Sequence, residues 1–147
     1  MEAYKNILCG TDFSKQSESA VGRAVELAKR FGAKLTLLHV VEYFPEDRSN
    51  EMIAPEDVDP KAYREEQSGK LLTELVQKFD CKDARHEVVF STHSAGREIV
   101  RYAGEQQVDL VIVGSHGYHG MTVILGSTAI TVIHSAPCDV LAIRSSK

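Results

Sequence analysis

Five short apolar segments rich in β-branched residues recur along the chain, separated by longer segments of mixed polarity. They are NILCG (6–10), KLTLLHVV (34–41), HEVVF (86–90), DLVIVG (109–114) and DVLAIR (139–144). Runs of this length and composition, bounded by turn-forming residues, are typical of buried strands. The pattern therefore predicts five strands.

The segments between these strands carry apolar residues at helical spacing. The clearest example runs through residues 14–33, where apolar side chains recur every three or four positions between a candidate N-cap, Ser14, and a stop at Gly32. Further helices are predicted from about Pro60 to Phe79, across residues 95–107 behind the candidate cap Ser94, and from near Gly126 to just before Pro137.

Strand and helix patterns thus alternate through the chain, apart from residues 43–60, where three prolines among acidic residues predict a solvated loop. Such alternation favours a parallel sheet covered by helices on both faces and joined by right-handed crossovers. We therefore expect a doubly wound α/β fold with a five-stranded parallel sheet. Neither an internal repeat nor a change in composition divides the chain, so a single domain is expected over residues 1–147.

Composition narrows the function classes. With 147 residues, 43% hydrophobic and 26% charged, the chain is typical of one globular domain. Its formal net charge is −4 and its basic residues are spread out, so neither nucleic acid nor an anionic membrane is an expected partner. The absence of a long apolar run and of a signal pattern predicts a cytoplasmic protein. The three cysteines form no C-x-x-C pair and are interpreted as reduced packing residues.

Glycines point to the candidate chemistry. Residues 109–133 contain four of them, between a predicted strand and a predicted helix, and GTDFS (10–14) follows the first strand. In open α/β sheets ligands bind beyond the carboxyl ends of strands, where glycine permits close approach and a helix N-terminus offers free N–H groups. Neither G-x-x-x-x-G-K-[ST] nor G-x-G-x-x-G occurs, so a phosphate site here needs a different motif.

The chain resembles the universal stress protein family from end to end. The residues that carry this resemblance are YKNILCGTDFS near the N-terminus, the KLTLLHVV strand, VDLVIVGSHG, GSTA and CDVLAIR. The resemblance implies a stress-response protein that binds ATP, with or without magnesium, and acts as a nucleotide-dependent signalling or protective module.

The resemblance also implies the site residues. Asp12 and the main chain around Gly10, Thr11 and Val40 would line an adenine and ribose pocket. The predicted phosphate-binding set, with His116 between its first two glycines, comprises Gly114, His116, Gly117, Gly126, Ser127 and Thr128. The residue chemistry agrees, because a carboxylate accepts hydrogen bonds from amines and hydroxyls while Ser and Thr donate to phosphate oxygens.

The glycine motif departs from the family pattern. Many nucleotide-binding members of the family that this chain resembles carry the motif G-x-x-G, then nine residues, then G-[ST]. In this chain only eight residues, 118–125, separate Gly117 from Gly126. The shorter spacing is similar to the universal stress protein A branch, whose members generally lack ATP binding but also tend to lose these glycines. The alternative function is therefore a dimeric interaction module with an empty pocket.

Simpler interpretations apply to several of these residues. Asp12 could cap the first helix or brace its loop, and the glycines could be turn residues. His116 and His119 lack a third nearby ligand, so no metal site is predicted. No serine, histidine and acid have a recognisable catalytic arrangement, so no catalytic residue is assigned and only slow ATP hydrolysis is conceivable. The remaining histidines, His39 among them, are interpreted as packing or surface residues.

The last predicted strand also suggests a partner. It lies near the end of the sequence and would form an edge of the sheet with unpaired backbone groups. Pairing with a second copy would satisfy them, and the family resemblance implies such a homodimer, with Val140 to Ile143 at the interface.

Overall fold

The computed structural model describes residues 3–43, 59–116 and 125–145. In chain order its elements are β1 (Asn6–Gly10), α1 (Lys15–Phe31), β2 (Lys34–Glu42), α2 (Pro60–Lys78), β3 (Arg85–Ser91), α3 (Ala95–Glu105), β4 (Leu110–Gly114), α4 (Ser127–Ser135) and β5 (Asp139–Ile143). The predicted alternation is confirmed. The predicted loop at 43–60 lies almost entirely outside the described residues.

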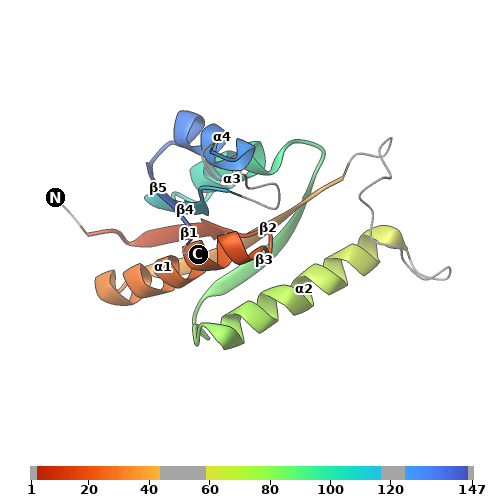
Figure 1. Ribbon diagram of the computed structural model, residues 1–147, viewed down its shortest axis with the longest axis horizontal. Coiled ribbons are helices and arrows are strands. Elements are labelled where there is room, and N and C mark those ends of the chain that lie inside the picture. The colour runs from red at the N-terminus through yellow and green to blue at the C-terminus, as the bar shows by residue number, and fades with distance from the viewer. Residues whose placement is uncertain (1–2, 44–58, 117–124, 146–147) are drawn as a thin grey trace.

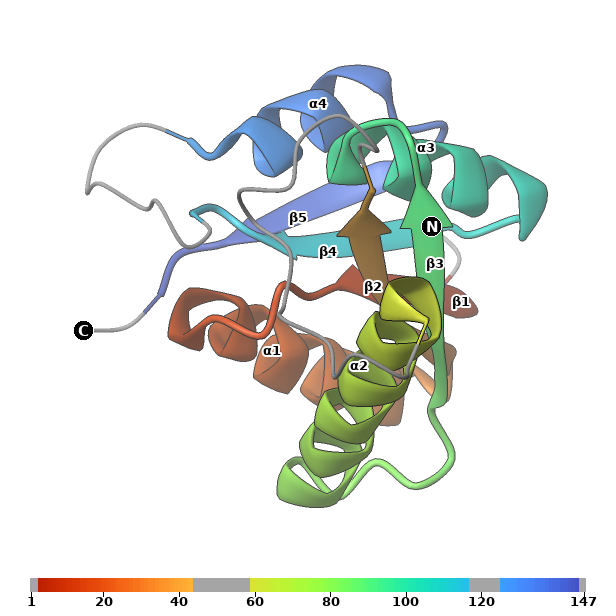
Figure 2. The ribbon, with the colours of Figure 1, turned by 90° about the vertical axis from the view of Figure 1, so that its right-hand side faces the viewer.

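The five strands form one parallel sheet in the order β3-β2-β1-β4-β5. Central β1 pairs on both sides, so that Ile7 lies opposite Leu35 of β2 and Leu110 of β4. Figure 1 shows the sheet between two layers of helices, and Figure 2 shows α1 and α2 on one face with α3 and α4 on the other. The doubly wound α/β class predicted from the sequence is confirmed.

Two apolar clusters fill the space between the sheet and its helices. Ile7 and Leu37 pack with α1 and α2, whereas Leu8 and Leu38 pack with α3 and α4. Side chains along a strand alternate between faces, so consecutive residues of β1 and of β2 enter opposite clusters. All four side chains are fully buried, and each contributes about 1.5–3 kcal/mol of burial free energy.

The predicted helix signals are also present. Ser14 Oγ accepts a hydrogen bond from Ser17 N at 3.1 Å, and Ser94 Oγ accepts one from Arg97 N at 3.3 Å. Gly32 ends α1 in the left-handed conformation (φ 62), which only glycine adopts without strain. Several element ends differ slightly from their predictions. For example, α3 ends at Glu105, and the chain turns through left-handed Gln107 (φ 55).

Candidate functional site

The carboxyl ends of β1 and β4 meet at the point where the strand order changes direction. After β1 the next strands, β2 and β3, lie on one side of β1, whereas β4 lies on its other side. Connections that diverge in this way leave a crevice beyond the strand ends, which is where open α/β sheets bind ligands. We call this switch point the β1/β4 crevice; the residues that follow or end its elements are Thr11 and Asp12 after β1, Gly114 at the end of β4 and Gly126 at the start of α4.

The loop after β1 is held by its own polar groups. Thr11 N donates to Leu38 O of β2 at 2.9 Å, and Thr11 Oγ1 accepts from Phe13 N at 3.1 Å. Asp12 Oδ1 accepts from Ser14 N at 2.9 Å. The bracing interpretation of Asp12 therefore describes one of its contacts, and the carboxylate is fixed at the mouth of the crevice by that bond.

Two of the predicted site glycines have a packing reason to lack a side chain. A Cβ at Gly10 would lie 2.9 Å from the Ile99 Cδ1 atom of α3. A Cβ at Gly114 would lie 3.3 Å from His116 O, 3.4 Å from Gln16 O and 3.5 Å from Ser17 Cα. Gly114 thus lets the end of β4 lie directly against the first turn of α1, which narrows the crevice.

The N-terminus of α4 is anchored at the end of β4. Ser115 N donates to Ile143 O of β5 at 2.8 Å, and Gly126 N donates to Ser115 O at 2.7 Å. Gly126 is the N-cap residue and supplies no side-chain cap, and the first turn, which contains Ser127 and Thr128, has no acidic residue. Its N–H groups and the positive end of the helix dipole suit an anion.

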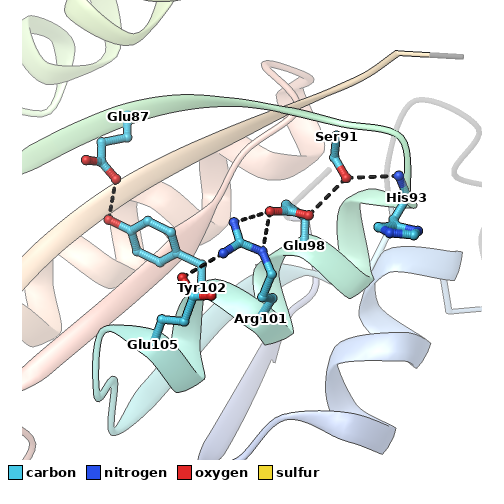
Figure 3. Close-up of polar contacts among 7 residues, drawn as sticks. All are labelled: Glu87, Ser91, His93, Glu98, Arg101, Tyr102 and Glu105. Atoms are coloured by element: carbon cyan, nitrogen blue, oxygen red, sulfur yellow. Dashed lines mark hydrogen bonds and ion pairs between the residues drawn. The ribbon is translucent and has the colours of Figure 1, made fainter. Parts of the chain in front are cut away.

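The other described helices have capped N-termini, and α3 is the clearest case. Besides the Ser94 cap, Glu42 Oε1 accepts from Ala95 N at 2.8 Å. Figure 3 shows the first turn continuing into a polar network, in which the Ser91 hydroxyl donates to Glu98 at 2.9 Å and Arg101 pairs with the same carboxylate. The α3 N-terminus already holds its negative charge, so it does not compete for an added anion.

His116 has an unusual environment in the crevice. Its Nδ1 lies 3.2 Å from Ser115 Oγ, while its Nε2 is buried and has no hydrogen-bond partner among the described residues. Buried polar atoms are almost always paired, so a lone one calls for an explanation such as a ligand or water. Gly117, the neighbour that completes the predicted glycine pair, lies outside the described residues, as do His119 and Gly120.

Other predicted site residues are placed as follows. Ser127 is exposed and Thr128 half-buried in the first turn of α4. The Val40 side chain is buried in the α3/α4 cluster, so only its main chain is available to a ligand, as the sequence suggested. The structure thus brings together Thr11, Asp12, Gly114 and the α4 N-terminus through the pairing of β1 with β4 and the bond from Gly126 to Ser115.

His39 was missed by the sequence argument. Its Nδ1 lies 2.8 Å from Thr11 O, and its ring packs on the Phe13 ring with centroids 4.2 Å apart. Phe13 itself has a left-handed backbone (φ 65), a strained conformation for a bulky residue. One signal was available, because alternation along β2 places His39 on the apolar face that carries Leu37.

Three further observations limit the possible chemistry. Among the described residues, no group of three or more His, Cys, Asp or Glu side chains could hold a metal ion. A groove of about 740 Å³ lies at the opposite, amino-terminal end of the sheet, lined by residues such as Lys34, Arg85 and Tyr102, and it includes none of the predicted site residues. Within the part of the chain described, no helix has the length and apolar character needed to cross a bilayer.

Comparison with known proteins decides the family. The sequence model of the universal stress protein family matches residues 3–144. The chain belongs to the universal stress protein family. It is 34% identical over 140 residues to universal stress protein A homolog 1 of Coxiella burnetii, an alignment that covers 95% of this chain and 96% of that protein.

Solved structures of family members share the fold. Universal stress protein UspA from Lactobacillus plantarum superposes with a TM-score of 0.72 at 26% identity, covering 96% of this chain and 98% of that one. A universal stress protein crystallised in complex with cAMP gives a TM-score of 0.71 at 26% identity, covering 98% of this chain and 99% of that one. Nucleotide binding therefore occurs within this family on the same architecture.

Proposed function

We propose that this universal stress protein binds ATP in the β1/β4 crevice, within one domain that spans the chain. The observation that carries the proposal is the uncapped N-terminus of α4, fixed beside the end of β4 and next to the loop after β1. Free N–H groups at a helix start, adjacent to a strand-end loop with a carboxylate, match the two parts of a nucleotide. The family member in complex with cAMP supports an adenine nucleotide as the class of ligand.

The residues divide between the two ends of the ligand. Asp12 and the main chain of Gly10, Thr11 and Val40 receive the adenosine, because a carboxylate accepts from ribose hydroxyls and backbone groups pair with the base. The phosphates are received by Gly114, His116, Gly117, Gly126, Ser127 and Thr128, which offer hydroxyl, imidazole and backbone N–H groups. The buried, unpartnered Nε2 of His116 gains a polar partner if it faces a phosphate oxygen.

Occupancy, not turnover, is the proposed signal. Magnesium would be held by phosphate oxygens, since the described residues supply no metal cluster of their own. No catalytic residue is assigned: Asp12 Oδ1 is engaged with Ser14 N, and His116 Nε2 is proposed to contact a phosphate oxygen. Three free thiols, at Cys9, Cys81 and Cys138, fit the reducing cytoplasm that we propose as its location.

We also propose a homodimer through β5. Each edge strand begins with a charged residue, but β3 also carries half-buried Glu87, whereas β5 continues with the apolar residues Val140 to Ile143. Charged residues protect an edge strand from pairing, and an apolar edge invites it. Ile130 and Ile133 of the neighbouring α4 are each 49% exposed, which adds apolar surface close to that edge.

The binding test begins with mass spectrometry of small molecules released from freshly purified protein, followed by calorimetric titration with ATP and magnesium. Asp12→Asn keeps an oxygen for Ser14 N but removes the charge, and we expect about tenfold weaker binding. Asp59→Asn, the same change at the α2 N-cap, is the control and should bind ATP like the unmodified protein. Absence of bound nucleotide and of binding heat would instead support the interaction module.

The dimer is tested separately by sedimentation at micromolar concentration. Val140→Lys places a charge on the half-buried β5 edge and should shift the protein toward monomer. Glu87→Lys on β3 is unsuitable as a control because Glu87 accepts from Tyr102, so exposed His86→Lys on the same strand is used and should leave the dimer intact. A monomer without any substitution would overturn the dimer but not ATP binding.

A further inference from the structure

The backbone of Thr11 is held toward β2 by both of its polar groups. Thr11 N donates to Leu38 O at 2.9 Å, and Thr11 O lies 2.8 Å from His39 Nδ1. A carbonyl oxygen only accepts, so Nδ1 carries the proton and the tautomer of the ring is fixed. Burial lowers the pKa of His39, and the Thr11 carbonyl and the Asp12 carboxylate offset this only in part, so the imidazole is neutral at neutral pH.

This contact sets the direction of the next peptide group. The described chain has no cis peptide bond, and in a trans peptide the C=O and the N–H point in opposite directions. Because the Thr11 carbonyl points toward the His39 ring, the N–H of Asp12 points away from that ring. Asp12 N donates to none of the described residues, so it is available to a ligand in the β1/β4 crevice.

Phe13 shows that this orientation is imposed on the loop. Its backbone is left-handed (φ 65), which costs about 1–2 kcal/mol for a residue with a side chain. The strain is maintained by Phe13 N donating to Thr11 Oγ1 at 3.1 Å and by the Phe13 ring packing on His39. His39 therefore contacts both ends of the turn, one by a hydrogen bond and one by ring packing.

We propose that His39 is a positioning residue, which locks the Thr11–Asp12 peptide so that the Asp12 N–H faces a ligand oxygen in the crevice. With the opposite peptide orientation the Thr11 carbonyl oxygen would face the crevice. It would repel an anionic oxygen or any other hydrogen-bond acceptor of the ligand. This inference rests on the proposed nucleotide function for the identity of the ligand. The peptide orientation itself is a property of the ligand-free protein and is testable without nucleotide.

Variants of the full chain separate the hydrogen bond from the ring packing. His39→Phe keeps an aromatic ring against Phe13 but loses the donor, whereas His39→Asn loses the ring but keeps an N–H donor close to the Nδ1 position. We expect His39→Phe to bind ATP about tenfold more weakly and His39→Asn to return to within about threefold of the unmodified protein. His86→Phe, the same substitution at an exposed histidine of β3, should not change the affinity.

The second readout is the carbonyl ¹³C chemical shift of Thr11, with the ring ¹⁵N signals of His39, measured without nucleotide. The carbonyl signal should move in His39→Phe and stay near its original place in His39→Asn. An unchanged signal in His39→Phe overturns the positioning role even if ATP binds. If the NMR signals change as expected but the unmodified protein binds no ATP, the nucleotide function and the ligand part of this inference are overturned. If His39→Phe does not fold, His39→Leu takes its place and is compared with His39→Asn in the same way.

Discussion

The N-termini of α3 and α4 lie on the same face of the sheet but are finished in opposite ways. At α3, Ser94 and Glu42 accept from backbone N–H groups, and Glu98 places a carboxylate in the first turn. At α4, Gly126 provides no side-chain cap and no acidic residue follows it. One helix start carries its own anionic partners and the other leaves its N–H groups free to bind one.

The difference shows how a fold assigns stability and binding to neighbouring elements. Burial opposes ionisation of Glu98, but the hydrogen bonds from Arg101 and Ser91 outweigh it and hold the pKa of its carboxyl below the ordinary value. The α3 end is therefore charged and satisfied in the resting protein. The α4 end gives up the stability that a side-chain cap adds over glycine, about 0.5 kcal/mol in typical helices, which is consistent with a site kept open for a ligand.

The largest change in stability is expected at Gly96, where the two helices touch. A Cβ there would lie 2.7 Å from Thr131 Cβ and 3.3 Å from Thr128 O. Gly96→Val should therefore lower the free energy of unfolding by about 3 kcal/mol and displace the α4 start, weakening ATP binding as well. Chemical denaturation and titration measure the two effects.

Gly69→Val in α2 is the matched control, because a Cβ there meets nothing within 4 Å. It should leave the free energy of unfolding within about 0.5 kcal/mol and ATP affinity unchanged. Equal destabilisation by both variants would show that the contact between α3 and α4 does not account for the loss at Gly96.

A smaller loss of stability is expected when the hydrogen bonds of Glu98 in α3 are removed. Glu98→Ala removes the acceptor of the buried Ser91 hydroxyl, while Arg101, whose side chain is 47% exposed, regains water. We expect the free energy of unfolding to fall by about 2 kcal/mol, and less in Glu98→Gln, which retains an acceptor. ATP affinity should not change in either variant, since the proposed ATP site lies at the N-terminus of α4 and not at that of α3.

The Glu98 contribution should also depend on pH in a defined direction. A carboxyl whose pKa is lower in the folded protein stabilises it fully above the ordinary carboxyl pKa of about 4.3, and this contribution is lost as the pH falls through the folded value. The difference in unfolding free energy between the unmodified protein and Glu98→Gln should therefore stay constant above about pH 4.3 and shrink as the pH falls from there through the folded pKa. A constant difference would mean that Glu98 does not titrate differently on folding.

Loss of the cap alone should cost still less. Ser94→Ala removes the acceptor of Arg97 N, and because Glu42 still accepts from Ala95 N, we expect a loss of about 1 kcal/mol. Denaturant titration with an unchanged slope would confirm that only stability moved. ATP binding at α4 serves as the internal check and should be unaffected.

The sequence predicted local features better than contacts between elements. Periodicity and turn residues predicted every strand and helix, and Ser14 and Ser94 were identified as caps because capping is local. The Glu98 network and the bond from His39 to Thr11 join residues of different elements, so single-chain patterns do not reveal them. Gly10 and Gly114 were read as ligand positions, whereas the structure adds close packing that a sequence cannot show.

The smallest change in stability, with the largest change in binding, is expected at Gly126. Its backbone is extended (φ −64, ψ 155), which is the usual N-cap conformation and open to any residue. Gly126→Asp should therefore cap α4 and make it resemble α3, raising the free energy of unfolding by about 0.5 kcal/mol. The same carboxylate would occupy the N–H groups and repel phosphates, so ATP binding should fall at least about tenfold.

Gly126→Ser distinguishes the cap from the charge. A serine hydroxyl accepts a hydrogen bond from a backbone N–H group at the start of α4 without adding a negative charge. The ATP affinity of Gly126→Ser should therefore lie between those of the unmodified protein and Gly126→Asp. If Gly126→Asp bound ATP as well as the unmodified protein while becoming more stable, the α4 N-terminus would be an ordinary uncapped helix end. The contrast with α3 would then reflect local stability alone, and the phosphates would have to be sought elsewhere in the crevice.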